Sequence, residues 1–596
     1  MSVVSIASAS APGCCVLPAR TLPCPRPTYF GPADRPLFGI VHRPPSPWTG
    51  ARILLCAPLG YEGLFSYLTL NDLAVRLAEA TSAVVMRFDY DGAGDSAGAD
   101  DDDDRIRRAL ASIDHAIEHL KGLSDAPGRL LIVGLRAGAL LAACAAAKRD
   151  DVSAIALWAP CASGKAFVRE QKVFSQMTES SPPAPPGLGR SWGERGFEAN
   201  GHVFTDAMVR ALEALSFAGL ETPPAPDILL LHRADMPALR IPPGWSRAAV
   251  EELSVPGYSE MMEPPWLWKS PDQAMQMLCD WARRIVVSGE VSLPSNCDRG
   301  QEHAVVAHGI VERPVRFGAG GGRFGILTRP DQGPSSGAVV LVTSTYGYRV
   351  GPNRINVELA RRLAAAGIST LRLDVRGVGD SRDEPGSPPG SPYQTDAIDD
   401  VVQAVRYLEA EGYRRIALHG VCAGAFLAWQ AALVLDGSIG LVLANLETFV
   451  PIPYDRENHL AFIAGAPRRE SPRTAADKAR RIFERLPRLV DKVTTIVLAH
   501  LPSTFRPDGL PAQLVRLGRR GSKVILVFGD DDPGLHQYLL RTGLRHFGLW
   551  RSGVVKIVTI AGADHSFTPR WAVERLSSVV TGELEAWFAS PESASR

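Results

Sequence analysis

A short sequence pattern occurs twice in this chain, at residues 134–138 and 420–424. Both copies read Gly-x-x-Ala-Gly, follow a short apolar run and open an Ala-rich helical stretch. Small residues at these positions permit a sharp turn from a strand into a helix, which lifts the central side chain above the sheet. We therefore predict two strand-turn-helix units, with Arg136 at the centre of the first turn and Cys422 at the centre of the second.

The segments before these turns also repeat. Residues 87–96 and 372–381 share the pattern Arg-x-Asp-x-x-Gly-x-Gly-Asp-Ser. The distance from its Asp to the centre of the turn is 47 residues in the first half (136 − 89) and 48 in the second (422 − 374). Strands that alternate with helices at this spacing predict βαβ units and a mostly parallel sheet. We expect an α/β protein of two tandem domains, each built on a doubly wound sheet.

The length of 596 residues is too great for a single hydrophobic core. Each half contains a long segment without clear alternation, at residues 162–226 and 446–520, which we interpret as a helical lid or as an insertion that only packs. We expect a flexible tail over residues 1–27, a first domain over 28–288, a linker over 289–313 and a second domain over 314–590.

Composition argues against several kinds of partner. Lys and Arg total 64, as do Asp and Glu, so the net charge is zero and nothing indicates a nucleic-acid or membrane-surface partner. No apolar run approaches the ~20 residues that cross a bilayer, and the first 27 residues do not resemble a secretory signal. Nine cysteines lack metal-ligand spacing. We expect a soluble cytoplasmic protein without metal or cofactor, in which the acidic run 100–104 begins a solvated helix.

The second half contains the residue types needed for nucleophilic catalysis in the expected order. A Cys nucleophile needs a base, and the base needs an orienting acid. An apolar strand after Cys422 ends in Gly-Asp-Asp-Asp-Pro, where we favour Asp532 over Asp530 and Asp531 as the acid. The next strand leads into a loop with His565, which we predict to be the base. The helix start and an imidazolium would both stabilise the thiolate.

Two further roles can be assigned to the second half. The oxyanion of an acyl intermediate would be held by the backbone N–H of Ala423 and by a second N–H from Thr345 or Tyr346, in the loop after an earlier strand. Arg349 lies in the same loop and could meet an anionic group of the substrate, although arginines near a helix start are as often surface residues.

The first half lacks two of these three catalytic residue types. Arg136 replaces the nucleophile, and no histidine occurs between His232 and His303, where a base should stand. Hydrolysis by this half through a Ser-His or Cys-His route is therefore not expected. Arg136 would either bind a carboxylate or phosphate group or form an ion pair with Asp235 or another buried acid.

Both halves resemble the α/β-hydrolase superfamily, and more narrowly the serine aminopeptidase-like (S33-type) hydrolases. The residues that carry the likeness are 87–96, 134–138, 372–381, 420–424 and the segments at Asp532 and His565. The first half is also similar to bacterial hydrolases associated with exosortase systems, through residues 58–62, 134–138 and 157–160. The resemblance implies a tandem duplication of this fold. Cys422 departs from the usual Ser, and Arg136 removes the nucleophile.

These observations favour a hydrolase that acts on an ester or thioester of a small acyl substrate, free or carrier-bound, through an acyl-enzyme on Cys422. A thioester intermediate resists water better than amines, so transfer of the acyl group to an amine or alcohol is the alternative. A second alternative is a non-enzymatic double pseudo-hydrolase that acts as a binding or scaffold protein. The sequence does not indicate an oligomeric state.

Overall fold

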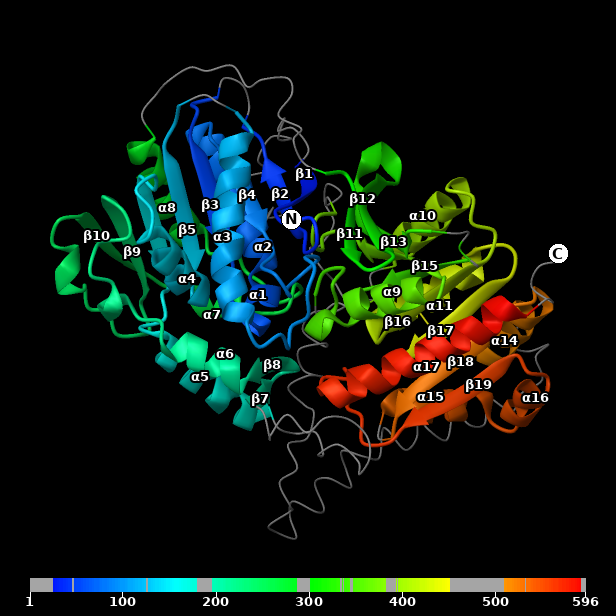
Figure 1. The fold of residues 1–596 in the computed structure, drawn as a ribbon. Helices are drawn as coiled ribbons and strands as arrows, with labels where there is room; N and C mark the ends of the chain where they lie inside the picture. Colours follow the sequence, from blue (N-terminus) through cyan, green and yellow to red (C-terminus); the bar gives the residue numbers. More distant parts are fainter. Residues whose placement is uncertain are drawn as a thin grey trace, which may run out of the picture.

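Two large sheets, one in each half of the chain, form the framework of the molecule (Figure 1). The computed structural model describes residues 25–44, 48–124, 127–178, 196–286, 301–332, 335, 337–343, 347–381, 393, 395–450, 509–530 and 532–590. Figure 1 shows the sheets side by side with helices packed on their faces.

The first sheet has eight strands in the order β1-β2-β4-β3-β5-β6-β9-β10. Strands β1 and β2 run antiparallel, β2 is antiparallel to β4, and the pairs from β4 to β10 are parallel. The inner strands are buried along their whole length, as their continuous apolar sequences predict. The strands are Arg26–Phe30 (β1), Leu37–His42 (β2), Arg52–Cys56 (β3), Val84–Phe88 (β4), Leu130–Leu135 (β5), Ala154–Trp158 (β6), Asp227–Arg233 (β9) and Ala249–Val255 (β10).

The second sheet has nine strands in the order β11-β12-β13-β15-β14-β16-β17-β18-β19. Apart from the added edge strand β11, its order and directions repeat those of the first sheet. The strands are Ala304–Ala307 (β11), Ile310–Phe317 (β12), Arg323–Pro330 (β13), Ala338–Val342 (β14), Ser369–Asp374 (β15), Ile416–Val421 (β16), Ile439–Ala444 (β17), Val524–Gly529 (β18) and Val555–Ile560 (β19). Residues 304–313, predicted to be linker, are therefore part of this sheet.

Helices cover both faces of each sheet. In the first half, α2 (Tyr67–Thr81) and α8 (Asp272–Ile285) pack on one face, and α3 (Arg105–Gly122) and α4 (Ala137–Ala146) on the other. In the second half, α9 (Ile355–Ala365) and α17 (Arg570–Ala589) cover one face, and α10 (Ala397–Ala410), α11 (Ala423–Val434) and α14 (Leu510–Arg519) the other. Shorter helices are α1 (Tyr61–Phe65), α7 (Tyr258–Met261), α15 (Pro533–Thr542) and α16 (Arg545–Arg551).

The two predicted lids differ in how much of them is described. The first contains helix α5 (Gly164–Thr178), the hairpin β7 (Gly196–Ala199) and β8 (His202–Thr205), and helix α6 (Asp206–Glu213). Residues 451–508 of the second lie outside the described residues. The boundary at residue 520 is wrong, because α14 places Leu510, Leu514 and Leu517 in the core beneath the sheet.

Reciprocal ion pairs join the two halves. Arg87 of the first half donates to Asp380 of the second at 2.6 Å, and Arg372 of the second donates to Asp95 of the first. The Arg and Asp of each pair occupy matching positions of the two repeated segments, so the contacts are those of a two-fold interface. A small apolar core that includes Phe38 and Phe324 also spans the contact.

Candidate active site

Cys422 occupies the turn between β16 and α11. Its backbone angles, φ 53° and ψ −119°, are strained for a residue with a side chain. The flanking glycines are required by close packing, because a Cβ at Gly420 would lie 2.4 Å from Gly424, and a Cβ at Gly424 would lie 2.5 Å from the carbonyl oxygen of Val342. The sheet and helix thus hold Cys422 in the conformation of a nucleophile elbow.

Asp532 and His565 meet beside this turn. The loops after β18 and β19 place Asp532 Oδ2 2.5 Å from His565 Nδ1, with the Asp532 side chain only 1% exposed. Oδ1 of Asp532 accepts a hydrogen bond from the N–H of Gly534 at 2.8 Å, which fixes the carboxylate. Burial lowers the pKa of His565, but hydrogen bonds to Asp532 and Cys422 outweigh it and raise the pKa to about 11. Asp532 and His565 therefore form a hydrogen-bonded pair, and the pKa of His565 responds to Cys422.

The other candidates for the acid are less well placed. Asp530 is exposed, and in the described part of the chain its carboxylate accepts the N–H of Gly562 at 3.0 Å rather than an N–H of His565. Asp531 lies outside the described residues.

Tyr393 and Glu447 adjoin the same group, although no sequence motif marks them. The hydroxyl of Tyr393 lies 3.7 Å from Cys422 Sγ, and Tyr393 has a positive φ of 58°. Burial raises the pKa of Tyr393 far above its usual value, and neighbouring Cys422 and Glu447 raise it further. Burial also raises the pKa of Glu447, while nearby His565 lowers it. The only sequence feature that could have indicated Glu447 as a site residue is its position just beyond the end of β17.

One predicted oxyanion donor, Ala423, lies at the start of α11. Ala423 is buried and begins α11, where the first backbone N–H groups have no partner within the helix. Its N–H is therefore in position to stabilise negative charge next to Cys422. Thr345 and Tyr346 lie outside the described residues.

Arg349 does not line a substrate site, so this prediction is wrong. The side chain is fully buried and forms ion pairs with Asp95 of the first half and with Asp374 and Asp380 of the second, at 2.7 to 2.8 Å. Its guanidinium also lies over the ring of Phe324, at 4.6 Å from the centroid. Since three carboxylates already surround it, Arg349 holds the two halves together.

Arg136 forms ion pairs at the first turn. It has nearly the same backbone angles as Cys422, φ 56° and ψ −122°. Its Nε lies 2.9 Å from Glu62, and Nη2 donates to Glu170. Tyr258 donates to the same Glu62 oxygen at 2.8 Å. The acid that pairs with Arg136 is thus Glu62 rather than Asp235, so the guanidinium binds carboxylates of its own chain.

The first half also contacts the loops that hold the second-half group. Arg354, after β14, donates to the carbonyl oxygens of Gly94 and Gly98, both at 2.8 Å. At the start of α17, directly after the His565 loop, the N–H of Arg570 donates to Glu198 of the β7–β8 hairpin at 3.0 Å. Residues of one half therefore fix two loops of the other.

The described residues form neither a metal cluster nor a membrane-spanning helix. No group of three His, Cys, Asp or Glu side chains in these ranges is arranged to hold a metal ion. Within the same ranges, none of the helices combines the length and apolar character needed to span a bilayer.

Comparison with known proteins agrees with this architecture. Residues 339–574 match the model of the alpha/beta hydrolase family. Similar solved structures include Est1E from Butyrivibrio proteoclasticus (15% identity, 43% of this chain and 96% of that chain, TM-score 0.31) and an alpha-beta serine hydrolase homologue from Coxiella burnetii (17%, 44%, 91%, 0.27). A dienelactone hydrolase from Anabaena variabilis is also similar (15%, 46%, 97%, 0.28). No curated protein matches the chain. The family match over residues 339–574 shows that the second half has the alpha/beta hydrolase fold.

Proposed function

We propose that the second half hydrolyses an ester or thioester of a small acyl substrate, with Cys422 as nucleophile, His565 as base and Asp532 as the acid that orients it. The observation that carries this proposal is the Asp532–His565 pair, 2.5 Å apart, beside Cys422 at the strained turn, where Cys422 contributes to the raised pKa of His565. This is the arrangement of a nucleophile, a base and an orienting acid.

The first chemical step forms the acyl-enzyme. Sγ of Cys422, whose proton passes to His565, attacks the carbonyl carbon, and the carbonyl π electrons move onto oxygen. The N–H of Ala423 stabilises this oxyanion. When the intermediate collapses, the bond to the leaving alcohol or thiol breaks, and the leaving group takes the proton from His565.

The second step releases the acid. His565 accepts a proton from water as the water oxygen attacks the thioester carbon. Collapse of this intermediate breaks the C–S bond and regenerates the Cys422 and His565 pair. An amine or alcohol in place of water would give acyl transfer. A thioester intermediate resists water better than it resists amines, so it favours transfer to an amine. We also propose that the chain is related to aminopeptidase-like and exosortase-associated hydrolases. These resemblances do not define the substrate.

The first half serves this site as a support in our proposal. Arg136 occupies its turn, and the carboxylates of Glu62 and Glu170 neutralise it. Loops of the second half are held by acceptors of the first half. These acceptors are Asp95, Glu198 and the backbone carbonyl oxygens to which Arg354 donates hydrogen bonds. Its retention is therefore explained by contacts rather than by catalysis.

Intact-mass measurement tests the proposal. The protein would be incubated with p-nitrophenyl acetate, p-nitrophenyl butyrate and an acyl thioester, then quenched in acid. We expect a mass increase of one acyl group, which is lost in Cys422→Ala. The control is Cys279→Ala, because Cys279 is buried and burial raises its thiol pKa to about 11.

The outcomes separate the candidate functions. Release of free acid supports hydrolysis, and release of an amide when an amine is added supports transfer. Absence of both adduct and turnover with every donor would overturn the enzymatic proposal and favour the scaffold.

A further inference from the structure

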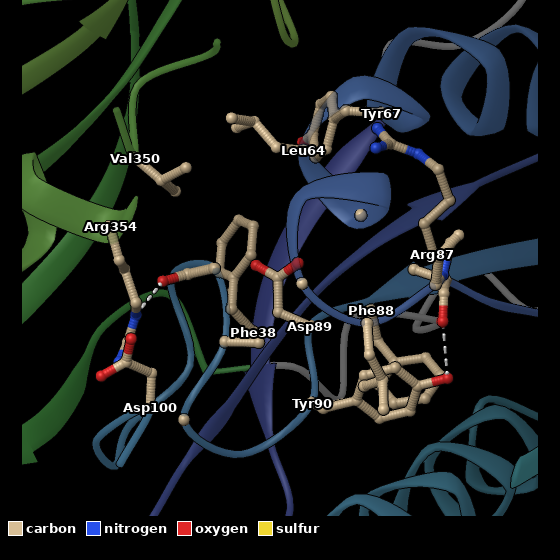
Figure 2. Close-up of a pocket in the computed structure, with 18 of the residues that line it drawn as sticks. Phe38, Leu64, Tyr67, Arg87, Phe88, Asp89, Tyr90, Asp100, Val350 and Arg354 are labelled. Carbon is tan, nitrogen blue, oxygen red and sulfur yellow. Dashed lines mark hydrogen bonds between the residues drawn. The ribbon is translucent and has the colours of Figure 1, made fainter. Parts of the chain in front are cut away.

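A cavity of about 100 Å³ lies between the two halves, at the carboxyl ends of β3 and β4 (Figure 2). Its walls come from the first half and from the loop after β14 of the second half, with Phe38, Leu64 and Val350 among the apolar residues. Ligands of open α/β sheets bind at the carboxyl ends of the strands. The cavity is separate from the group around Cys422, whose members do not line it.

Asp89 lines this cavity and differs from its counterpart in the second half. Asp89 and Asp374 hold the same position in the two repeated segments. Asp374 accepts two hydrogen bonds from Arg349, one from the backbone N–H at 2.6 Å and one from the guanidinium at 2.8 Å. Arg349 belongs to the loop after β14, whereas the segment between β3 and α2 in the first half, residues 57–66, contains no arginine or lysine.

The hydrogen bonds of Asp89 reflect this difference. Within the described residues, Asp89 accepts the backbone N–H of Asp95 at 2.8 Å, and no arginine donates to it. Burial raises the pKa of Asp89 to about 7, and the neighbouring charge of Asp95 contributes. Figure 2 shows the Asp89 carboxylate directed into the space between Phe38, Leu64 and Val350.

Asp100 provides a second carboxylate in the cavity wall. The predicted helix does begin after the acidic run, but Asp100 is only 2% exposed rather than solvated. Among the described residues, neither of its carboxylate oxygens has a hydrogen-bond partner, and its ion pair with Arg570 is long, at 3.8 Å. A buried carboxylate without a hydrogen-bond donor is costly, so a donor at this position would be favourable.

The arginines of the wall already donate to other acceptors. Arg87 donates to Asp380, Arg354 to three carbonyl oxygens of the first half, and Arg105 to the carbonyl oxygen of Asp100. His202 adds a buried Nε2 without a partner, and burial lowers the pKa of His202 to about 4, so its ring is neutral near pH 7. Among the described residues, the buried polar atoms of this wall without a hydrogen-bond partner are therefore both carboxylate oxygens of Asp100 and Nε2 of His202.

We propose that this cavity is a binding site for a small organic cation, a primary amine or amidine on an apolar body, whose nitrogen donates to Asp89 and Asp100. The apolar body would contact Phe38, Leu64 and Val350. The cation would take the place beside Asp89 that Arg349 takes beside Asp374. This site does not depend on the chemistry proposed for Cys422.

Titration of the full-length protein with benzylamine and benzamidine tests the site. Thermal midpoints and calorimetry should both show saturable binding of the two cations. Benzoate should not bind, and the affinity for neutral benzyl alcohol should be at least about tenfold weaker than for benzylamine. Preference for benzoate, equal affinity for benzyl alcohol, or no binding by either cation would overturn the proposal.

Variants locate the binding. Asp100→Asn should weaken binding of the cations about tenfold or more, whereas Asp103→Asn, an exposed residue of the same acidic run, should not change it. Leu64→Trp should block the cavity without altering a carboxylate, which provides a second test if Asp100→Asn is unstable. Unchanged affinity in both Asp100→Asn and Leu64→Trp would contradict this location.

Discussion

Arg87 and Asp380 form an ion pair across the two halves in which the side chains are only 7% and 3% exposed. Removal of one member of such a pair leaves a buried charge without its partner. We expect Arg87→Met to cost about 3–5 kcal/mol of unfolding free energy. Denaturant unfolding would measure this cost. As a control, Arg284→Met at the exposed Arg284–Glu251 pair should cost about 1 kcal/mol or less, and equal costs would show that the interface pair is unimportant.

The pairing of Arg136 with Glu62 predicts a structural role for the first turn. Arg136→Met leaves Glu62 buried without its cation, so we expect the thermal midpoint to fall. The double variant Arg136→Met/Glu62→Gln should recover part of the loss. Acylation of Cys422 should persist in whichever variant remains folded, and its specific loss in a folded Arg136→Met protein would mean that Arg136 acts in the reaction.

The hydrogen bond between Asp532 and His565 predicts a large effect on turnover. Asp532→Asn keeps the shape of the side chain but removes the charge that orients and stabilises the imidazolium. We expect kcat to fall on the order of 10²–10⁴-fold, measured with the ester that acylates Cys422. Asp530→Asn should have little effect on kcat. A larger loss of kcat in Asp530→Asn than in Asp532→Asn would mean that Asp530 is the acid that orients His565.

The pKa of His565 predicts how stability depends on pH. Burial lowers this pKa, but the bonds to Asp532 and Cys422 raise it to about 11, against about 6.5 for the unfolded chain. A pKa that is higher in the folded state gives stability that is fully present below pH ~6.5 and is lost as pH rises through ~11. The thermal midpoint of the wild type should therefore fall toward that of His565→Asn between pH 7 and 11. A constant difference between the two proteins would contradict the raised pKa.

The hydroxyl of Tyr393 lies close to the atom that forms the acyl bond. We predict that it donates a hydrogen bond to the reacting group, so Tyr393→Phe should lower kcat on the order of 10²-fold with KM nearly unchanged. Steady-state kinetics would separate the two parameters. Tyr407→Phe is the control, since the Tyr407 hydroxyl bonds to exposed Glu411 and to Arg313 rather than to Cys422. An unchanged kcat in Tyr393→Phe would remove this residue from the mechanism.

Much of the fold could be predicted because the local signals agree. The inner strands are continuous apolar runs, and the turns at Arg136 and Cys422 have glycines that tight backbone packing requires. Asp532 and His565 could be placed because both follow strands whose carboxyl ends share one edge of the sheet with Cys422.

The errors of prediction arise from contacts between distant segments. Arg349 and Asp95 are separated by 254 residues, and no local pattern indicates that one half supplies carboxylates to the other. Glu62 and Arg136 likewise meet across 74 residues. Tyr393 and Glu447 lie in loops without a motif, so only the folded structure brings them to Cys422.

The matched ion pairs have a consequence for each half on its own. Each repeated segment contains both an Arg and an Asp that fit the other segment, so a single half presents a self-complementary face. Two copies of one half could therefore associate in the manner of the joined halves. Arg349 of the second half adds an ion pair with Asp95 of the first, and two copies of the first half would lack this pair because residues 57–66 contain no arginine or lysine. Covalent joining of the unlike halves therefore gives the first half a partner with more ion pairs than a second copy of itself.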